Sequence, residues 1–128
     1  MSFNKSDYMK AKYTCIAIDD DPLFLDIFEY MANKVDNLHL VNTYTNLADV
    51  VKGVVKFKPD ILFLDIEMPH LDGFKAMAAF VHRPKIVIVS AHVSYDIDRL
   101  NLDISKFVSK PIKSPLQLDD IVKEVMSE

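Results

Sequence analysis

The 128-residue sequence has few of the features that mark secreted, membrane or nucleic-acid-binding chains. Its single cysteine, Cys15, cannot form a disulfide within the chain, which fits a reducing cytoplasm. No apolar run approaches the ~20 residues that span a bilayer. Residues 1–12 form a polar lead-in without the apolar segment of a signal peptide. Because the formal net charge is −4 and there is no basic block, we expect this chain itself to bind neither membrane nor nucleic acid.

Half of the residues are apolar, which is enough to build a sizeable core. The length suits one compact domain, which we place at residues 13–128. Short apolar runs bounded by polar residues predict five strands. The predicted strands are Tyr13–Ile18, Leu38–Val41, Ile61–Leu64, Ile86–Val89 and Ile104–Val108.

Apolar residues at helical spacing between these strands predict five helices. The helices are expected near residues 22–31, 47–55, 74–81, 97–100 and 114–125. Pro22 suits the first turn of a helix, and Asn46 and Ser114 can cap the second and the last helix. In the first helix the apolar residues at helical spacing are Leu23, Phe24, Ile27, Phe28 and Met31.

Strands that alternate with helices predict an α/β fold with a parallel sheet covered by helices on both faces. In such a sheet, all strands point their carboxyl ends toward one edge, where ligands bind. Polar residues follow or end four of the predicted strands. They are Asp19–Asp21, Asp65, Ser90 and Lys110. We therefore expect these side chains to meet in one pocket.

The chemistry of such a pocket follows from its charges. Crowded carboxylates repel one another, and a hard divalent cation relieves that repulsion. Oxygen ligands in a small site favour Mg²⁺. A carboxylate such as Asp65 can attack a phosphoryl group, while Lys110 neutralises charge on the transferring oxygens. Ser90 could donate a hydrogen bond to one of those oxygens.

The sequence resembles the receiver domain of bacterial two-component response regulators. Four motifs in the family's order carry the resemblance, which covers about Tyr13 to Met126. They are IAIDDDP (Ile16–Pro22), ILFLDIEMPHLDG (Ile61–Gly73), IVIVSAH (Ile86–His92) and FVSKPI (Phe107–Ile112). The resemblance implies a doubly wound, flavodoxin-like α/β fold, with five helices and a five-stranded parallel sheet in the order 2-1-3-4-5.

The resemblance also implies roles for the acidic residues. Asp65 resembles the phosphoacceptor, which takes a phosphoryl group from a sensor histidine kinase or a phosphotransfer protein. Asp19 and Asp20 resemble the acid pair that holds Mg²⁺, Asp20 directly and Asp19 through water. The backbone carbonyl of Glu67 resembles a further metal ligand, beside Asp65 itself.

A second group of residues resembles the family's switch. Ser90 resembles the hydroxyl residue that moves toward the phosphoryl group, and Phe107 the aromatic residue that reorients with it. Lys110 resembles the lysine that pairs with the phosphoryl group, and its bond to Pro111 resembles the family's cis peptide. The surface that responds would be formed by the fourth helix, the fifth strand and the fifth helix. In this family that surface meets a partner or pairs two receivers weakly.

The output of such a domain cannot be named from these residues. DDDP together with FLDIEMP is similar to receivers that occur with LytTR-type DNA-binding domains, yet the output domain or effector is unknown. Lys106 stands where an acidic residue is common in the family, and LNLDI (Leu100–Ile104) lacks the usual glycine or alanine. Both departures fall on the surface expected to respond.

Other interpretations remain open at this point. Asp65-Ile66-Glu67 loosely matches the Asp-x-Asp motif of phosphatase-like hydrolases, which also form an aspartyl phosphate. A small Mg²⁺-dependent hydrolase is therefore the alternative function. Structural interpretations also exist: Asp21 more simply caps a helix, Phe107 packs in the core, and Ser90 is an ordinary strand-end hydroxyl.

Overall fold

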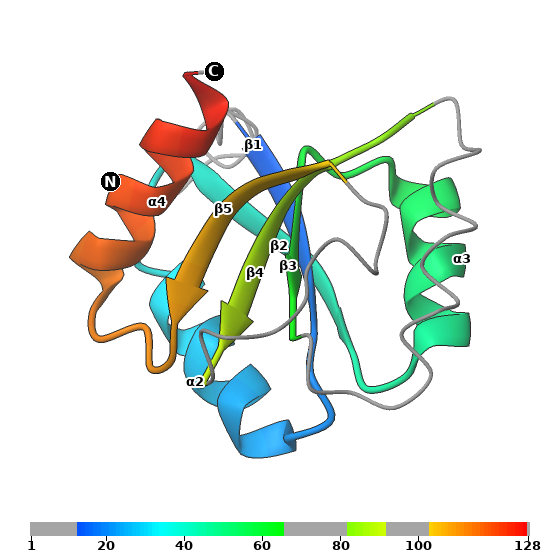
Figure 1. Cartoon of the computed structure of the whole chain (residues 1–128), viewed down its shortest axis with the longest axis horizontal. Helices are drawn as coiled ribbons and strands as arrows, with labels where there is room; N and C mark the ends of the chain where they lie inside the picture. The colour runs from blue at the N-terminus through cyan, green and yellow to red at the C-terminus, as the bar shows by residue number, and fades with distance from the viewer. Residues whose placement is uncertain (1–12, 66–81, 92–102, 128) are drawn as a thin grey trace, which may run out of the picture.

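The computed structural model describes residues 13–65, 82–91 and 103–127. Five strands form one sheet in the order β2-β1-β3-β4-β5, and each neighbouring pair is parallel (Figure 1). The strands are β1 (Tyr13–Ile18), β2 (Leu38–Tyr44), β3 (Ile61–Leu64), β4 (Lys85–Ser90) and β5 (Ile104–Ser109). The predicted α/β class and the strand order implied by the resemblance are confirmed.

Three helices lie in the described residues: α2 (Pro22–Ala32), α3 (Leu47–Phe57) and α4 (Pro115–Met126). Their N-caps are Asp21, Asn46 and Ser114, and each cap side chain accepts a hydrogen bond from a backbone N–H of the first turn. The two helices predicted near residues 74–81 and 97–100 fall outside the described residues. Within the described ranges, every helix is too short or too polar to cross a bilayer.

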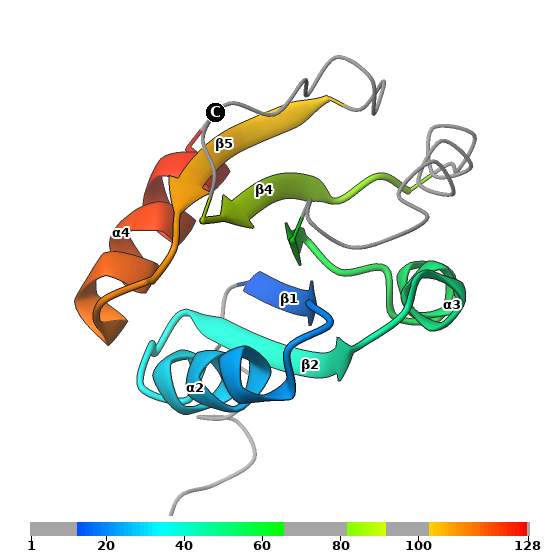
Figure 2. The ribbon, with the colours of Figure 1, turned by 60° about the horizontal axis from the view of Figure 1, so that its bottom comes forward.

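The sheet separates two apolar layers. Figure 2 shows α2 and α4 on one face of the sheet and α3 on the other. Successive strand residues point to opposite faces. In β1, Cys15 and Ala17 join the cluster beneath α2 and α4, whereas Ile16 and Ile18 join the cluster beneath α3. Because both faces of the sheet are covered, β3 buries all four of its residues, which explains its unbroken apolar run in the sequence.

The buried face of α2 includes only some of the apolar residues at helical spacing. Leu23 and Ile27, which belong to the apolar residues at helical spacing, are 64% and 46% exposed. The residues that pack on the sheet are Leu25, Phe28, Met31 and Ala32. The helix carries two overlapping apolar stripes, and spacing alone does not reveal which one the sheet will cover.

Two aromatic rings connect the helix that follows β1 to the strand that precedes Asp65. Phe28 of α2 and Phe63 of β3 are both fully buried, and their ring centroids lie 4.8 Å apart in a tilted arrangement. Tilted aromatic pairs at this separation attract beyond their burial. The pair therefore fixes α2 against the strand that ends at Asp65.

We predict that Phe63→Ala lowers the free energy of unfolding by about 4 kcal/mol, because it removes a buried ring and leaves a cavity. Urea denaturation measures this loss. Leu116→Ala is the control: Leu116 is exposed on α4, and its truncation should change the free energy by less than about 0.5 kcal/mol. Equal losses in the two variants would contradict the assigned core.

Candidate functional site

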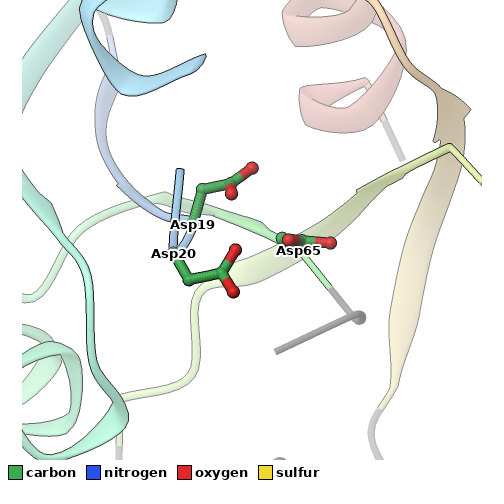
Figure 3. Close-up of side chains that lie close together, drawn as sticks. All are labelled: Asp19, Asp20 and Asp65. Carbon is green, nitrogen blue, oxygen red and sulfur yellow. The ribbon is translucent and has the colours of Figure 1, made fainter. Parts of the chain in front are cut away.

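Three carboxylates converge where β1 and β3 end. β1 and β3 are adjacent, with Ile18 paired to Leu64. The next residues along these strands are Asp19 and Asp65, and Asp20 follows Asp19. Carboxylate oxygens of the three residues lie within 4.8 Å of one another (Figure 3). The convergence that the sequence predicts for these acids is therefore present in the fold.

Backbone hydrogen bonds hold two of the acids in place. The N–H of Asp19 donates to the carbonyl of Tyr44 at 3.1 Å, and the N–H of Asp65 donates to the carbonyl of Ile18 at 3.1 Å. These bonds continue the sheet ladder one residue beyond the strands. Asp19 and Asp65 are buried, whereas Asp20 is exposed. One carboxylate of the cluster thus faces solvent while two are enclosed.

The carboxylate of Asp19 is bound on both oxygens. Its Oδ1 accepts the N–H of Asp21 at 2.9 Å, and its Oδ2 accepts the ammonium of Lys110 at 2.7 Å. Asp21 plays a different part, because its Oδ1 accepts the N–H of Leu23 at 3.0 Å and caps α2. The three consecutive acids therefore differ in surroundings: one is enclosed, one is exposed and one caps a helix.

Lys110 brings a positive charge into this cluster from the end of β5. Its Nζ lies 2.7 Å from Asp19 Oδ2 and 3.6 Å from Asp65 Oδ2, and its side chain is 19% exposed. The N–H of Lys110 donates to the carbonyl of Ser90 at 2.8 Å, which ties the lysine to the end of β4. The peptide bond between Lys110 and Pro111 is cis. We call Asp19, Asp20, Asp65 and Lys110 together the acidic site.

The charges of the acidic site suit a divalent cation. Three carboxylates and one ammonium give a formal charge of −2. All the ligand atoms that the three acids offer are oxygens, which hard cations such as Mg²⁺ prefer. Opposite oxygens in a Mg²⁺ octahedron lie about 4.2 Å apart, since each bond is ~2.1 Å. The spacing of the cluster therefore fits Mg²⁺ after small adjustments, with waters completing the shell.

The other residues singled out in the sequence occupy varied positions. Ser90 is fully buried at the end of β4, at the same edge of the sheet as the acids. Phe107 is half-buried and packs against the apolar cluster beneath α3. Pro111 is exposed. Glu67 lies outside the described residues.

Sequence reasoning missed one neighbour of the acidic site. The ring of Phe24, in the first turn of α2, has its centroid 4.6 Å from the Nζ of Lys110. In the sequence Phe24 stood out only as one of the apolar residues at helical spacing in the first helix. The only sequence signal that Phe24 lies near the acidic site is that it follows Asp20 by four residues. The first turn of a helix lies close to the loop that precedes it, and its side chains tilt toward the N-terminus.

We predict that Lys110→Met lowers the free energy of unfolding by about 3 kcal/mol in metal-free buffer, because it leaves enclosed carboxylates without a counter-charge. Lys123→Met is the matched control. Lys123 also pairs with an aspartate, at 2.9 Å from Asp119, but on the exposed surface of α4. Exposed pairs contribute little, so the control should unfold like the wild type. Urea titrations in EDTA compare the three proteins, and an unchanged Lys110→Met would contradict the electrostatic role.

The acidic site lies where the order of the strands reverses, between β1 and β3. Ligand sites of open α/β sheets occur at this point. Fold and site together define a flavodoxin-like α/β domain with an acidic centre at the switch point. The family model described as the response regulator receiver domain matches residues 15–123, and the chain belongs to this family.

Curated relatives include regulators and enzymes from bacteria. The transcriptional regulatory protein BtsR of Salmonella typhi is 30% identical over 100 residues, which cover 77% of this chain and 42% of BtsR. The protein-glutamate methylesterase/protein-glutamine glutaminase of Clostridium acetobutylicum is 32% identical over 126 residues, which cover 89% of this chain and 36% of the enzyme. The chain thus matches less than half the length of either relative.

Solved structures agree with the fold. The signal receiver domain of the response regulator NarL from Mycobacterium tuberculosis superposes with a TM-score of 0.78 at 19% identity, covering 91% of this chain and 98% of that one. A chain in the crystal structure of the P1 domain of CheA3 in complex with CheY6 from R. sphaeroides matches with a TM-score of 0.77 at 20% identity. The match covers 92% of this chain and 99% of that one.

Proposed function

We propose that this receiver domain accepts a phosphoryl group on Asp65 from a sensor histidine kinase or a phosphotransfer protein, with Mg²⁺ as cofactor. One observation carries the proposal: Asp65 shares a site with two further carboxylates, within 4.8 Å, and with the ammonium of Lys110, at 3.6 Å. A lone strand-end aspartate would need none of these partners. Membership in the receiver family supports the same chemistry.

Asp65 would act as the nucleophile. One of its carboxylate oxygens attacks the phosphorus of a phosphohistidine, in line with the bond that breaks. The new P–O bond forms as the P–N bond breaks, and the electron pair of that bond stays on the imidazole nitrogen, which takes a proton from solvent. β3 presents the carboxylate in a fixed position, because the Asp65 N–H is bound to the carbonyl of Ile18.

The remaining charges of the acidic site would stabilise the transferred group. Asp20, Asp65 and, through water, Asp19 would hold Mg²⁺, which would supply charge neutralisation at the phosphoryl oxygens. Asp20, which is exposed, and Asp65, which is buried at the end of β3, suit direct coordination. Asp19 already accepts two hydrogen bonds from protein groups, so it suits coordination through water. Lys110 lies nearer to Asp19 than to Asp65, and a short movement would bring its ammonium to a phosphoryl oxygen on Asp65.

The readout of phosphorylation would lie on a distant surface. We infer that Ser90 moves toward the phosphoryl group, that Phe107 reorients, and that the surface around β5 and α4 responds. The carbonyl of Glu67 would complete the protein ligands of the metal. An output domain or effector, or a second receiver in a weak homodimer, would bind that surface in the cytoplasm.

A Mg²⁺-dependent phosphatase-like hydrolase would also use an aspartyl phosphate. Among the described residues no observation favours it over the receiver function, and the motif it needs includes Glu67. Turnover separates the two functions: a receiver takes up one phosphoryl group per chain and loses it slowly. Multiple turnover of phosphate monoesters would favour the hydrolase.

We predict that Asp65→Asn abolishes acid-labile phosphorylation by acetyl phosphate in the presence of Mg²⁺, because an amide is a poor nucleophile. Label retained on the protein after gel filtration measures the reaction. Asp26→Asn removes an exposed carboxylate of α2 and is the control. It should label like the wild type, and EDTA should suppress labelling of both. Undiminished labelling of Asp65→Asn would exclude Asp65 as the acceptor.

A second prediction separates the adjacent acids Asp20 and Asp21. Asp20→Asn should weaken Mg²⁺ binding at least about tenfold, because even the loss of an outer-shell partner commonly costs that much. Asp21→Asn should leave Mg²⁺ binding intact, since asparagine caps a helix as well as aspartate does. Isothermal titration of Mg²⁺ compares the two variants. Equal losses would show that metal binding depends only on the local density of charge.

A further inference from the structure

We propose that Phe24 is a positioning residue for Lys110: its ring holds the ammonium at the acidic site while the charges around it change. The inference rests on the proposed phosphorylation of Asp65 and goes beyond it, because it assigns a role to a residue of α2 outside the set of charged groups. Its basis is the 4.6 Å separation between the ring centroid of Phe24 and the Nζ of Lys110.

Among the residues that the structure describes, the neighbours of the Lys110 ammonium include two carboxylates and one aromatic ring. Asp19 Oδ2 lies at 2.7 Å, Asp65 Oδ2 lies at 3.6 Å, and the Phe24 ring face lies at 4.6 Å from its centroid. A cation within about 6 Å of a ring centroid is attracted by the negative face of the ring. The attraction grows when the cation is partly removed from water, and the side chain of Lys110 is mostly buried.

The ring differs from the two carboxylates in one respect that matters for the function. A divalent cation at the acidic site competes with Lys110 for the carboxylates, and phosphorylation of Asp65 converts a carboxylate into an acyl phosphate. Both events change what the carboxylates offer to the lysine. The ring of Phe24 is neutral and does not change, so its attraction persists in every state.

The ring also permits movement that a hydrogen bond would resist. The hydrogen bond to Asp19 fixes both a distance and a direction. The attraction of a ring face is broader, because it acts on a cation anywhere over the ring. Lys110 can therefore move from Asp19 toward a phosphoryl oxygen on Asp65 without leaving the ring. Phe24 would keep the ammonium close to the site and partly shielded from water during that movement.

The position of the Phe24 ring is set by the core. Phe24 is half-buried, and its centroid lies 6.2 Å from that of Phe28. Phe28 in turn packs on Phe63 of β3 at 4.8 Å. A row of three rings thus runs from the lysine to the strand that carries Asp65. The Phe24 ring therefore lies against the core on one side and the lysine on the other.

Two substitutions of Phe24 test the proposal. Phe24→Leu keeps an apolar side chain but removes the ring, and Phe24→Tyr keeps the ring. With acetyl phosphate and Mg²⁺, we expect Phe24→Leu to phosphorylate about fivefold more slowly, the effect of a partly buried cation–ring contact. Phe24→Tyr should react at close to the wild-type rate. Leu23→Ala, at the exposed neighbouring position, should also react normally. Equal rates for Phe24→Leu and the wild type would overturn the proposal.

A double variant distinguishes positioning of the lysine from a general structural effect. In a Lys110→Met background, Phe24→Leu should cause no further loss of rate, because the group on which the ring acts is gone. A further fivefold loss in that background would show that Phe24 acts through the fold, and would overturn the proposal. Urea denaturation of each variant confirms that the proteins compared are folded under the assay conditions.

A measurement that needs no phosphorylation separates the two proposals. In NMR spectra of the unphosphorylated protein, the Cε protons of Lys110 should show an upfield ring-current shift that is lost in Phe24→Leu and retained in Phe24→Tyr. If the ring-current shift is lost in Phe24→Leu and retained in Phe24→Tyr, but the wild type takes up no phosphoryl group, the proposed function fails. If the wild type is phosphorylated but the shift is absent or survives in Phe24→Leu, the role of Phe24 alone fails.

Discussion

The parallel pairing of β1 with β3 is the constraint on which the site depends. The pairing of Ile18 with Leu64 makes Asp19 and Asp65 the next residues on two adjacent strands. Their burial places two negative charges in a region of low dielectric, which is costly unless a positive charge balances them. Lys110, from β5 at the far side of the sheet, provides that balance at 2.7 Å from Asp19. The site therefore depends on the arrangement of several strands, because its charges follow β1, β3 and β5.

The sequence predicted the sheet well, because a covered parallel strand is an unbroken apolar run. Both β1 and β3 begin and end at the predicted residues. β2 extends three residues beyond the predicted Val41, through Asn42, Thr43 and Tyr44. These residues are polar or aromatic, and they are exposed or only partly covered, so hydropathy does not mark them. They nevertheless pair with β1 after a register shift. Tertiary pairing, not local composition, sets that end.

Helix burial and the neighbours of the lysine were harder to predict. The first helix contains apolar residues on more than one face, and the sheet covers Leu25 rather than Leu23 or Ile27. The acids were found because strand ends share an edge, which is a property of the architecture. The contact between Phe24 and Lys110 joins residues 86 positions apart on two elements that are far apart in the sequence. The place of Phe24 shortly after Asp20 indicates only that it lies near the acids, and the folded chain is needed to show that its ring faces the lysine.

These features separate what the family shares from what this chain adds. The fold and the membership in the receiver family follow from the strand order and from the match over residues 15–123. The chemistry at Asp65 is the central claim, and direct mapping of the modified residue tests it. After incubation with acetyl phosphate and Mg²⁺, borohydride reduction should convert the modified residue 65 to homoserine, which peptide mass spectrometry detects. Homoserine at a different position, or none in a protein that binds Mg²⁺, would contradict the account.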